Sequence, residues 1–365
     1  MAGKNIQNEF REKISPFLKN KMVEIKNSKG EESKDFQALY RQYTLLDDEK
    51  NKSSEANKRH WEADIDIESN AQGVERLYNK SIVIEPTMIC ATHCRYCLRA
   101  NYDIFTLNEG ELKSIAKFCG NNNIDNQVNE VLITGGDPLI IPKRLGLLIE
   151  YLTEYAPNIK IIRIGTRLPQ HDPLRIDNNV YEIFRKHRNK VRFELATQIN
   201  HSVEFFNETI KVYKKFQRLG VPIYSQNVLL KGINDNIKSL EDLYNKMREN
   251  GIEAHYLFHC LPMRGMHHYR TSVDKGLRLA KELTNSGVVS GRAKPMYALM
   301  TDIGKITLYK GTIIKKDKKR NMILIQSTYK YKDRIANNPN WKLPQTAEID
   351  KDGYLRVWYL DGNDD

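Results

Sequence analysis

Residues 81–103, SIVIEPTMICATHCRYCLRANYD, decide the fold, because an apolar run typical of a β-strand leads directly into three closely spaced cysteines. Five further apolar runs follow along the chain, with amphipathic helical patterns between them. Strand-then-helix units in succession predict parallel strands joined by right-handed crossovers. The five further runs are NEVLITGG (129–136), IKIIRIGT (159–166), VRFELATQI (191–199), VPIYSQNVL (221–229) and IEAHYLFHCL (252–261).

The number of strand–helix units indicates an open barrel. Six units fall short of the eight of a closed TIM barrel, so the sequence predicts an α/β fold with a partial (β/α)6 TIM-like barrel over residues 76–290. Residues 1–75 are charged and carry Glu/Lys pairs at helical spacing, which predicts a helical N-terminal extension. Beyond residue 290, β-like stretches such as NMILIQSTYKY (321–331) predict a small β-rich region over 291–365.

The composition indicates a globular protein. The 365 residues are 40% hydrophobic, and no run of about 18 apolar residues occurs that could cross a membrane. The polar start, MAGKNIQNEFREKISPF, is not typical of a secretory signal, so we expect a cytoplasmic location. The formal charge of +12 could attract nucleic acid, a membrane surface or anionic small molecules. Clusters such as KKDKKR (315–320) are more often a solvated surface.

Cys90, Cys94 and Cys97 form a C-x3-C-x2-C array after the first strand, at the end where βα-barrels place their active sites. Three thiolates can hold three irons of a [4Fe–4S] cluster and leave the fourth iron open. The alternative is a structural zinc site completed by Cys119, Cys260 or a histidine. Zinc motifs more often pair two similar cysteine units, and the sequence has no second unit.

The array, with Tyr96 before its last cysteine and Gly135-Gly136-Asp137-Pro138 one strand later, resembles the signature of the radical S-adenosylmethionine (SAM) superfamily. The resemblance implies that SAM chelates the open iron and is cleaved reductively to methionine and a 5′-deoxyadenosyl radical, which abstracts hydrogen. It also implies a site in which Cys90, Cys94 and Cys97 bind the cluster, Tyr96 packs near the adenine, and Gly135, Gly136 and Asp137 contact the methionyl amino group of SAM.

Within that superfamily, residues 60–305 resemble the lysine 2,3-aminomutase group. In that group pyridoxal 5′-phosphate (PLP) binds the substrate amino group, and the nitrogen migrates between Cα and Cβ. A PLP-dependent 2,3-aminomutase is therefore the leading hypothesis. The matching stretches are IRIGTRLPQHDPLRI (162–176), ATQINHSVEFF (196–206), SQNVLLKGINDN (225–236) and HYRTSVDKG (268–276).

The same resemblance assigns roles to further polar residues. Arg99 lies where the group has the arginine that pairs with the substrate carboxylate. Arg76 and Lys80 approximate the basic pair that holds the PLP phosphate. Asp302 and Lys305 match the group's aspartate, assigned here to the substrate, and its PLP-attached lysine, if most of a glycine run is deleted.

The substrate end departs from the lysine-specific pattern. Lysine-specific members place an aspartate just after the sixth strand to bind the ε-ammonium, and this chain has Cys260-Leu261 there. Leucine cannot pair with an ammonium, so we expect an amino acid other than lysine. The side chains that could meet an anionic or polar substrate, or that lie exposed in a loop, are Arg264, His267 and His268.

Two other functions stay open. The same scaffold could work without PLP, in an epimerisation, a dehydrogenation or a fragmentation. A metal-containing nucleic-acid binder would fit the pI near 9.2 and predicts salt-dependent binding, but it leaves the GGDP stretch unexplained. For the enzyme we expect a small-molecule amino-acid substrate, a one-electron donor such as flavodoxin or ferredoxin, and no membrane partner, with a homo-oligomer left open.

Overall fold

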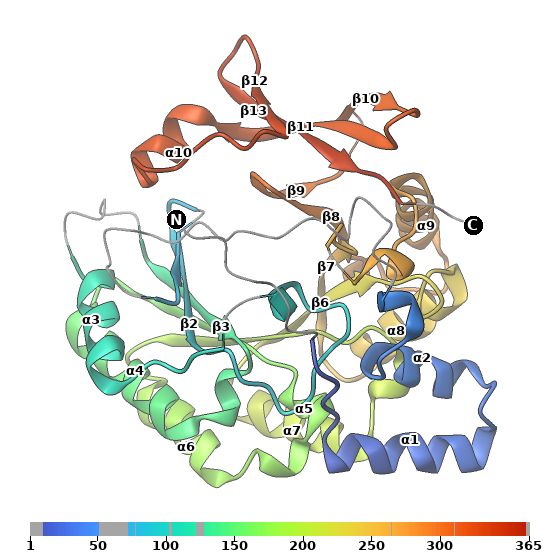
Figure 1. Ribbon diagram of the computed structural model, residues 1–365. Helices are drawn as coiled ribbons and strands as arrows, with labels where there is room; N and C mark the ends of the chain where they lie inside the picture. The colour runs from blue at the N-terminus through green and yellow to red at the C-terminus, as the bar shows by residue number, and fades with distance from the viewer. Residues whose placement is uncertain are drawn as a thin grey trace.

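The structure is a computed structural model of the chain (Figure 1). It describes residues 10–50, 72–76, 78–101, 104–121, 128–263, 265–309 and 311–362.

A curled sheet of nine strands forms the centre of the described chain, in the order β1 to β9. Neighbouring strands from β2 to β8 are parallel, whereas β1 and β9 pair antiparallel at the two edges. The partial barrel is thus confirmed, and the sheet continues past residue 290 because β8 adds a further parallel strand. The strands are β1 (Val74–Glu75), β2 (Ser81–Thr87), β3 (Glu130–Gly135), β4 (Ile161–Gly165), β5 (Arg192–Thr197), β6 (Ile223–Leu229), β7 (Glu253–His259), β8 (Met296–Thr301) and β9 (Gly304–Thr307).

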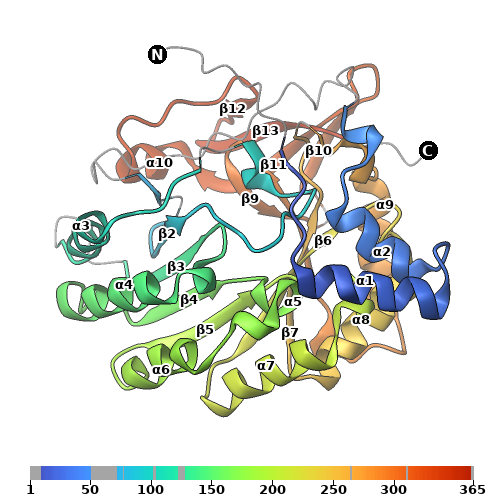
Figure 2. The same cartoon turned by 60° about the horizontal axis from the view of Figure 1, so that its bottom comes forward.

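Helices cover the convex face of this sheet (Figures 1 and 2). N-cap side chains fix the first residue of several helices. Asn108 forms a capping box with Glu111, and the Ser272 hydroxyl accepts a hydrogen bond from the backbone amide of Lys275. The apolar face of each helix packs on the strands, as its periodicity predicts. The covering helices are α3 (Glu109–Cys119), α4 (Pro142–Tyr155), α5 (Leu168–His171), α6 (Asn178–His187), α7 (Asn207–Arg218), α8 (Ile237–Glu249) and α9 (Val273–Asn285).

The concave face of the sheet remains partly open. In β3, Val131 and Ile133 point to the helices and are fully buried, whereas Glu130, Leu132 and Thr134 on the other face are half-buried. The same alternation runs through β4 and β6. Parallel strands packed on both faces would be buried throughout. The alternation therefore indicates a lumen inside the barrel whose lining side chains are partly exposed.

A second, antiparallel sheet of four strands lies over one edge of the barrel (Figure 1). Its residues Ile325 and Val357 belong to the same apolar core as the barrel strands. Arg270 adds polar contacts, donating to the carbonyls of Cys260 and Asp361 at 3.1 and 2.9 Å. The predicted β-rich C-terminal part is confirmed as β10 (Ile313–Asp317), β11 (Met322–Lys330), α10 (Tyr331–Asn337), β12 (Ala347–Ile349) and β13 (Tyr354–Leu360).

Two helices, α1 (Pro16–Lys29) and α2 (Lys34–Tyr43), precede the barrel and lie along its side (Figure 2). Phe17 packs edge-on against Phe206, which directly precedes α7. Residues 51–71 of the predicted helical extension lie outside the described part, and the three-part division of the chain stays a prediction.

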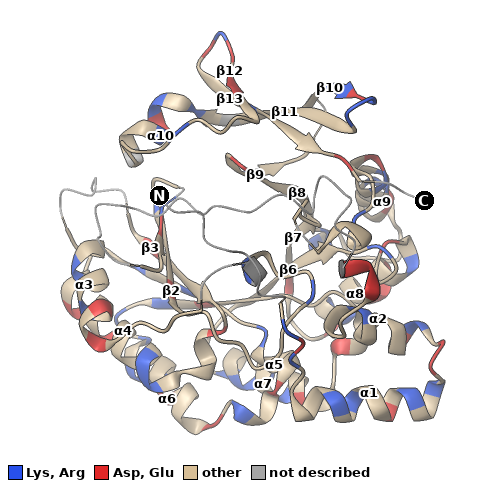
Figure 3. Ribbon diagram, in the orientation of Figure 1, with Lys and Arg blue, Asp and Glu red and all other residues tan. Residues whose placement is uncertain are grey.

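Many of the charged residues lie along the outer helices (Figure 3). Lys and Arg alternate with Asp and Glu over the outer helices, and Lys316 of the 315–320 cluster pairs with Asp274. Among the helices that the structure describes, none has both the length and the apolar character needed to span a bilayer.

Candidate active site

The three cysteines of the loop after β2 are free thiols, and each is partly exposed. They lie at the carboxyl end of the parallel strands, as predicted. Burial and, to a lesser degree, the nearby charge of Cys94 raise the pKa of Cys97 to about 11. Among the described residues, three or more His, Cys, Asp or Glu side chains are nowhere gathered closely enough to hold a single metal ion.

The glycines of the GGDP stretch bring β3 against the cysteine loop. Gly135 has φ +102°, and a Cβ there would lie 2.5 Å from the carbonyl oxygen of Thr87. A Cβ on Gly136 would lie 2.4 Å from the carbonyl oxygen of Ile89. The backbone amide of Gly136 donates to the carbonyl oxygen of Thr87 at 2.7 Å. The sequence predicted glycines that approach a ligand, and in the structure they approach the backbone leading to Cys90.

Asp137, predicted to contact SAM, is buried and joins the ends of β3 and β4. Its carboxylate accepts the hydroxyl of Thr166 and the backbone amides of Arg167 and Leu168, each at 2.8 Å. Burial raises the pKa of Asp137 to about 6, although these donors lower it, so the carboxylate is ionised at neutral pH. Asp137 therefore positions the loop after β4, which carries Arg167.

Replacing Asp137 with asparagine is expected to destabilise the fold by about 2–3 kcal/mol, because an amide NH2 would face backbone donors in a buried site. Chemical denaturation measures the change. Asp177→Asn is the matched control, because Asp177 caps α6 at its amino end and asparagine caps equally well. Equal unfolding free energies for the two variants would contradict the role of Asp137.

A buried polar cluster lies behind the cysteine loop and centres on Arg167. The guanidinium donates to Cys94 Sγ at 2.9 Å and to Glu204 Oε2 at 2.6 Å. It also donates to the hydroxyls of Tyr43, at 2.8 Å, and of Tyr96. Tyr96, predicted to lie near the adenine of SAM, is buried, and its hydroxyl donates to Gln42 Oε1 at 2.8 Å. Burial raises the pKa of the Cys94 thiol, and Arg167 lowers it.

Apart from Tyr96, the residues of this polar cluster were not predicted from the sequence. Gln42 and Tyr43 come from α2, Arg167 follows β4, and Glu204 follows β5, so no local spacing connects them. The one available signal is the arginine directly after the IRIGT run (162–166), at the strand end where the cysteines also lie.

Residues of the N-terminal segment form hydrogen bonds and an ion pair with the cysteine loop. Lys13 Nζ donates to the carbonyl of Cys90 at 2.7 Å, and the Ser15 amide donates to Thr92 Oγ1 at 2.9 Å. Arg95, between the second and third cysteines, forms a buried ion pair with Glu49 at 2.5 Å. The backbone around the cysteines is thus held from two sides, by β3 and by residues 13–49.

A second group of side chains lies at the meeting of the two sheet edges. Lys305 of β9 pairs with Met300 of β8, and its ammonium lies 4.0 Å from the ring centre of Tyr256. It is also 5.6 Å from the ring centre of Tyr78, which precedes β2. Tyr78 lies between Arg76 and Lys80, so the structure brings the predicted PLP-phosphate segment next to the predicted PLP lysine.

The other predicted polar residues have protein partners or lie elsewhere. Arg99 forms an ion pair with Glu85 of β2. Burial lowers the pKa of Arg99, but Glu85 and Glu75 raise it more, so it stays charged. Asp302 accepts the hydroxyl of Thr346 at 2.6 Å from the turn between β8 and β9. Lys80 is exposed at the start of β2, whereas Arg76 is buried.

The residues after β7, predicted at the substrate end of the site, lie in apolar or partly buried surroundings. Leu261 is half-buried among apolar side chains. Burial lowers the pKa of His268 to about 4, and its ring lies 3.9 Å from that of Tyr269. The charges that act on His268 include Asp48 and Arg41 of the N-terminal segment. Burial also lowers the pKa of His267, and Arg264 lies outside the described residues.

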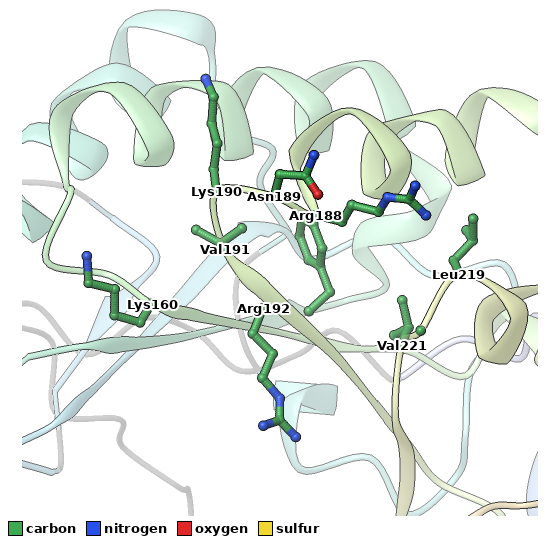
Figure 4. A pocket seen from close by; sticks show the side chains of 10 residues that line it. Lys160, Arg188, Asn189, Lys190, Val191, Arg192, Leu219 and Val221 are labelled. Atoms are coloured by element: carbon green, nitrogen blue, oxygen red, sulfur yellow. The ribbon is translucent and has the colours of Figure 1, made fainter.

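A cavity of about 430 Å³ lies away from these groups (Figure 4). It is lined by Lys160 before β4, Lys190 and Arg192 around the start of β5, and Val221 before β6. These are the amino ends of the parallel strands, opposite the cysteine loop. In Figure 4 the basic side chains point in different directions, so they do not converge on one ligand.

The Radical SAM superfamily matches residues 84–247, which contain the cysteine loop, the GGDP stretch and Arg167. These residues of the chain form a radical SAM domain. This family uses a [4Fe–4S] cluster and SAM.

The chain is also similar in sequence to several lysine 2,3-aminomutases. A putative L-lysine 2,3-aminomutase of Aquifex aeolicus is 32% identical over 245 residues, 65% of this chain and 63% of that protein. The L-lysine 2,3-aminomutases of Methanococcus maripaludis and Clostridium subterminale are 30% and 29% identical, over 64% of this chain and 53% and 55% of their own lengths. The chain thus matches little more than half to under two thirds of these relatives. A radical SAM methyltransferase from Sphaerobacter thermophilus, a solved structure, has 16% identity and a TM-score of 0.46, covering 63% of this chain and 69% of its own.

The residues fit the superfamily's cluster better than a zinc ion. Cys90, Cys94 and Cys97 supply three thiols from one loop, which is the donor set of a cluster with one open iron. Cys119, a candidate fourth zinc ligand, lies buried in the apolar core at the end of α3, and burial raises its pKa to about 12.

Proposed function

We propose that this radical SAM enzyme cleaves SAM at a cluster on Cys90, Cys94 and Cys97 and acts on an amino acid other than lysine, as a PLP-dependent 2,3-aminomutase. When bound, the cluster, SAM and PLP supply the electron, the hydrogen-abstracting radical and the group that stabilises the substrate radical. The observation that carries the proposal is the cysteine loop at the carboxyl end of β2, beside an open lumen.

The lumen gives a substrate two fixed charges. Arg99 would bind the substrate carboxylate with the part of its guanidinium that Glu85 leaves available, because a guanidinium carries five donors. Glu85 holds Arg99 in place from the concave face of β2. Lys305 lies over an aromatic ring, a setting that a cation tolerates and from which an amine can react.

The PLP part rests on Lys305 and its neighbours. Tyr78 and Tyr256 place aromatic rings beside the Lys305 amine, and a planar pyridine ring would pack against such rings. Buried Arg76 would bind the phosphate from the same segment as Tyr78. The similarity to lysine 2,3-aminomutases supports the reaction type, and Leu261 supports a different substrate.

The same scaffold without PLP is the second candidate. Lys80 lies exposed at the start of β2, and Asp302 faces Thr346, so two residues of the predicted PLP and substrate set point elsewhere. An epimerase, dehydrogenase or fragmentation enzyme would use the cysteine loop and Arg99 alone.

One anaerobic assay tests both candidates. The reconstituted chain is incubated with SAM, dithionite and a panel of amino acids, with and without PLP, and 5′-deoxyadenosine is measured. Faster release with one amino acid, only when PLP is present, is the expected result. Equal release without PLP would favour the second candidate, and release with lysine alone would contradict the assignment from Leu261.

A further inference from the structure

Arg167 makes a direct contact with one proposed cluster ligand. Its Nη1 donates to Cys94 Sγ at 2.9 Å, and its side chain is only 10% exposed. Arg167 lies two residues after the end of β4, and its backbone amide donates a hydrogen bond to the Asp137 carboxylate at 2.8 Å. Both the backbone and the head group of this arginine are therefore fixed.

The partners of the guanidinium leave it little freedom to turn away from the sulfur. Glu204 Oε2 accepts from Nη2 at 2.6 Å, and Tyr43 accepts from the same nitrogen at 2.8 Å. Glu204 is itself held by the backbone amides of Asn200 and His201, at 2.8 and 2.9 Å. The planar fork of an arginine can reach carboxylate, hydroxyl and sulfur at once, which a lysine cannot.

A donor and a positive charge at a ligand sulfur favour the more negative, reduced state of an iron–sulfur cluster. The effect is larger in a buried site, where water screens the charge less. We propose that Arg167 is a positioning residue for Cys94 that raises the reduction potential of the cluster, and that Glu204 and Tyr43 hold it there. This inference rests on the proposed cluster. It also gives α2 a role, because Tyr43 belongs to that helix.

The first test compares midpoint potentials in anaerobic redox titrations followed by electron paramagnetic resonance (EPR). The main variant is Arg167→Met with Glu204→Gln, which removes the buried charges together and leaves neither unpaired. We expect unchanged iron content and a reduction equilibrium constant about tenfold lower, which is about 59 mV for one electron. Glu204→Gln alone keeps the arginine and removes a negative charge, so its potential should not fall as that of the double variant does.

Tyr213→Phe is the matched control. It removes a buried, uncharged hydroxyl whose hydrogen bonds go to Thr197 and Gln170, and it keeps both Arg167 and Glu204, so it should leave the potential unchanged. A double variant with a full cluster and the potential of the unaltered chain would overturn the role of Arg167. An unaltered chain that assembles no cluster would instead overturn the proposed function.

The second test does not depend on the folding of the double variant. In unaltered protein labelled with 15N-arginine, pulsed EPR of the reduced cluster should detect hyperfine coupling to an arginine nitrogen. The coupling should disappear in Arg167→Lys, which keeps a cation beside Glu204 but withdraws the fork from the sulfur. A coupling that is absent from the unaltered chain, or that persists in Arg167→Lys, would overturn the proposal.

Discussion

Cys94→Ala is expected to lose the cluster and to lower SAM cleavage by about 10³-fold or more, because the three thiolates act as one ligand set. The sulfur of Cys94 is the one that Arg167 contacts, at 2.9 Å. The alanine variant lacks both the proposed iron ligand and the sulfur that accepts the hydrogen bond from Arg167. Iron and sulfide content and 5′-deoxyadenosine release measure the two effects.

The control for this prediction is Cys119→Ala. Cys119 is buried in the apolar core at the end of α3, so alanine removes a small amount of packing and no proposed ligand. This variant should keep its iron and its activity, with a small loss of stability. Cleavage by Cys94→Ala at the rate of Cys119→Ala would mean that the cysteine loop does not hold the cluster.

Lys305→Ala is expected to lose PLP attachment and to lower the PLP-dependent reaction by about 100-fold or more, because the amine that holds PLP is removed. The test is borohydride treatment followed by peptide mass spectrometry, which should find the modification on Lys305 in the unaltered chain. The cluster and SAM cleavage in the absence of substrate should be unaffected, because the Lys305 amine lies against Tyr78 and Tyr256 and supplies no cluster ligand.

Lys238→Ala is the matched control, because Lys238 is an exposed lysine of α8 paired with Asp242. It should keep both PLP attachment and activity. A modification found on another lysine would contradict the role of Lys305. If no lysine is modified in a chain with an intact cluster and added PLP, the enzyme without PLP is favoured. SAM cleavage lost in Lys305→Ala would instead contradict the separation of the two sites.

The barrel could be predicted because its signal is local. Alternating apolar residues such as Val131 and Ile133, and caps such as Asn108, fix each strand and helix from its own sequence. The added strand β8 was not predicted as part of the barrel. Its run, Met296–Thr301, leads into the hairpin with β9, and periodicity alone does not distinguish a parallel from an antiparallel partner.

The site was predictable only where its residues are close in sequence. The cysteines and the glycines form short motifs, although the contacts of Gly136 proved to be with the loop backbone. Arg167, Glu204 and Tyr43 come from separate elements, and only the fold brings them together. The neighbours of Lys305 likewise depend on the meeting of the two sheet edges, which sequence spacing does not reveal.

The binding of a SAM-accessible cluster by Cys90, Cys94 and Cys97 is tested by the EPR spectrum of the anaerobically reconstituted, dithionite-reduced chain, recorded before and after SAM is added. A cluster held by three cysteines leaves one iron open, so binding of SAM should change the spectrum. We expect a [4Fe–4S] signal that shifts with SAM and is absent from Cys94→Ala. A signal that SAM leaves unchanged, or a chain without one, would contradict it.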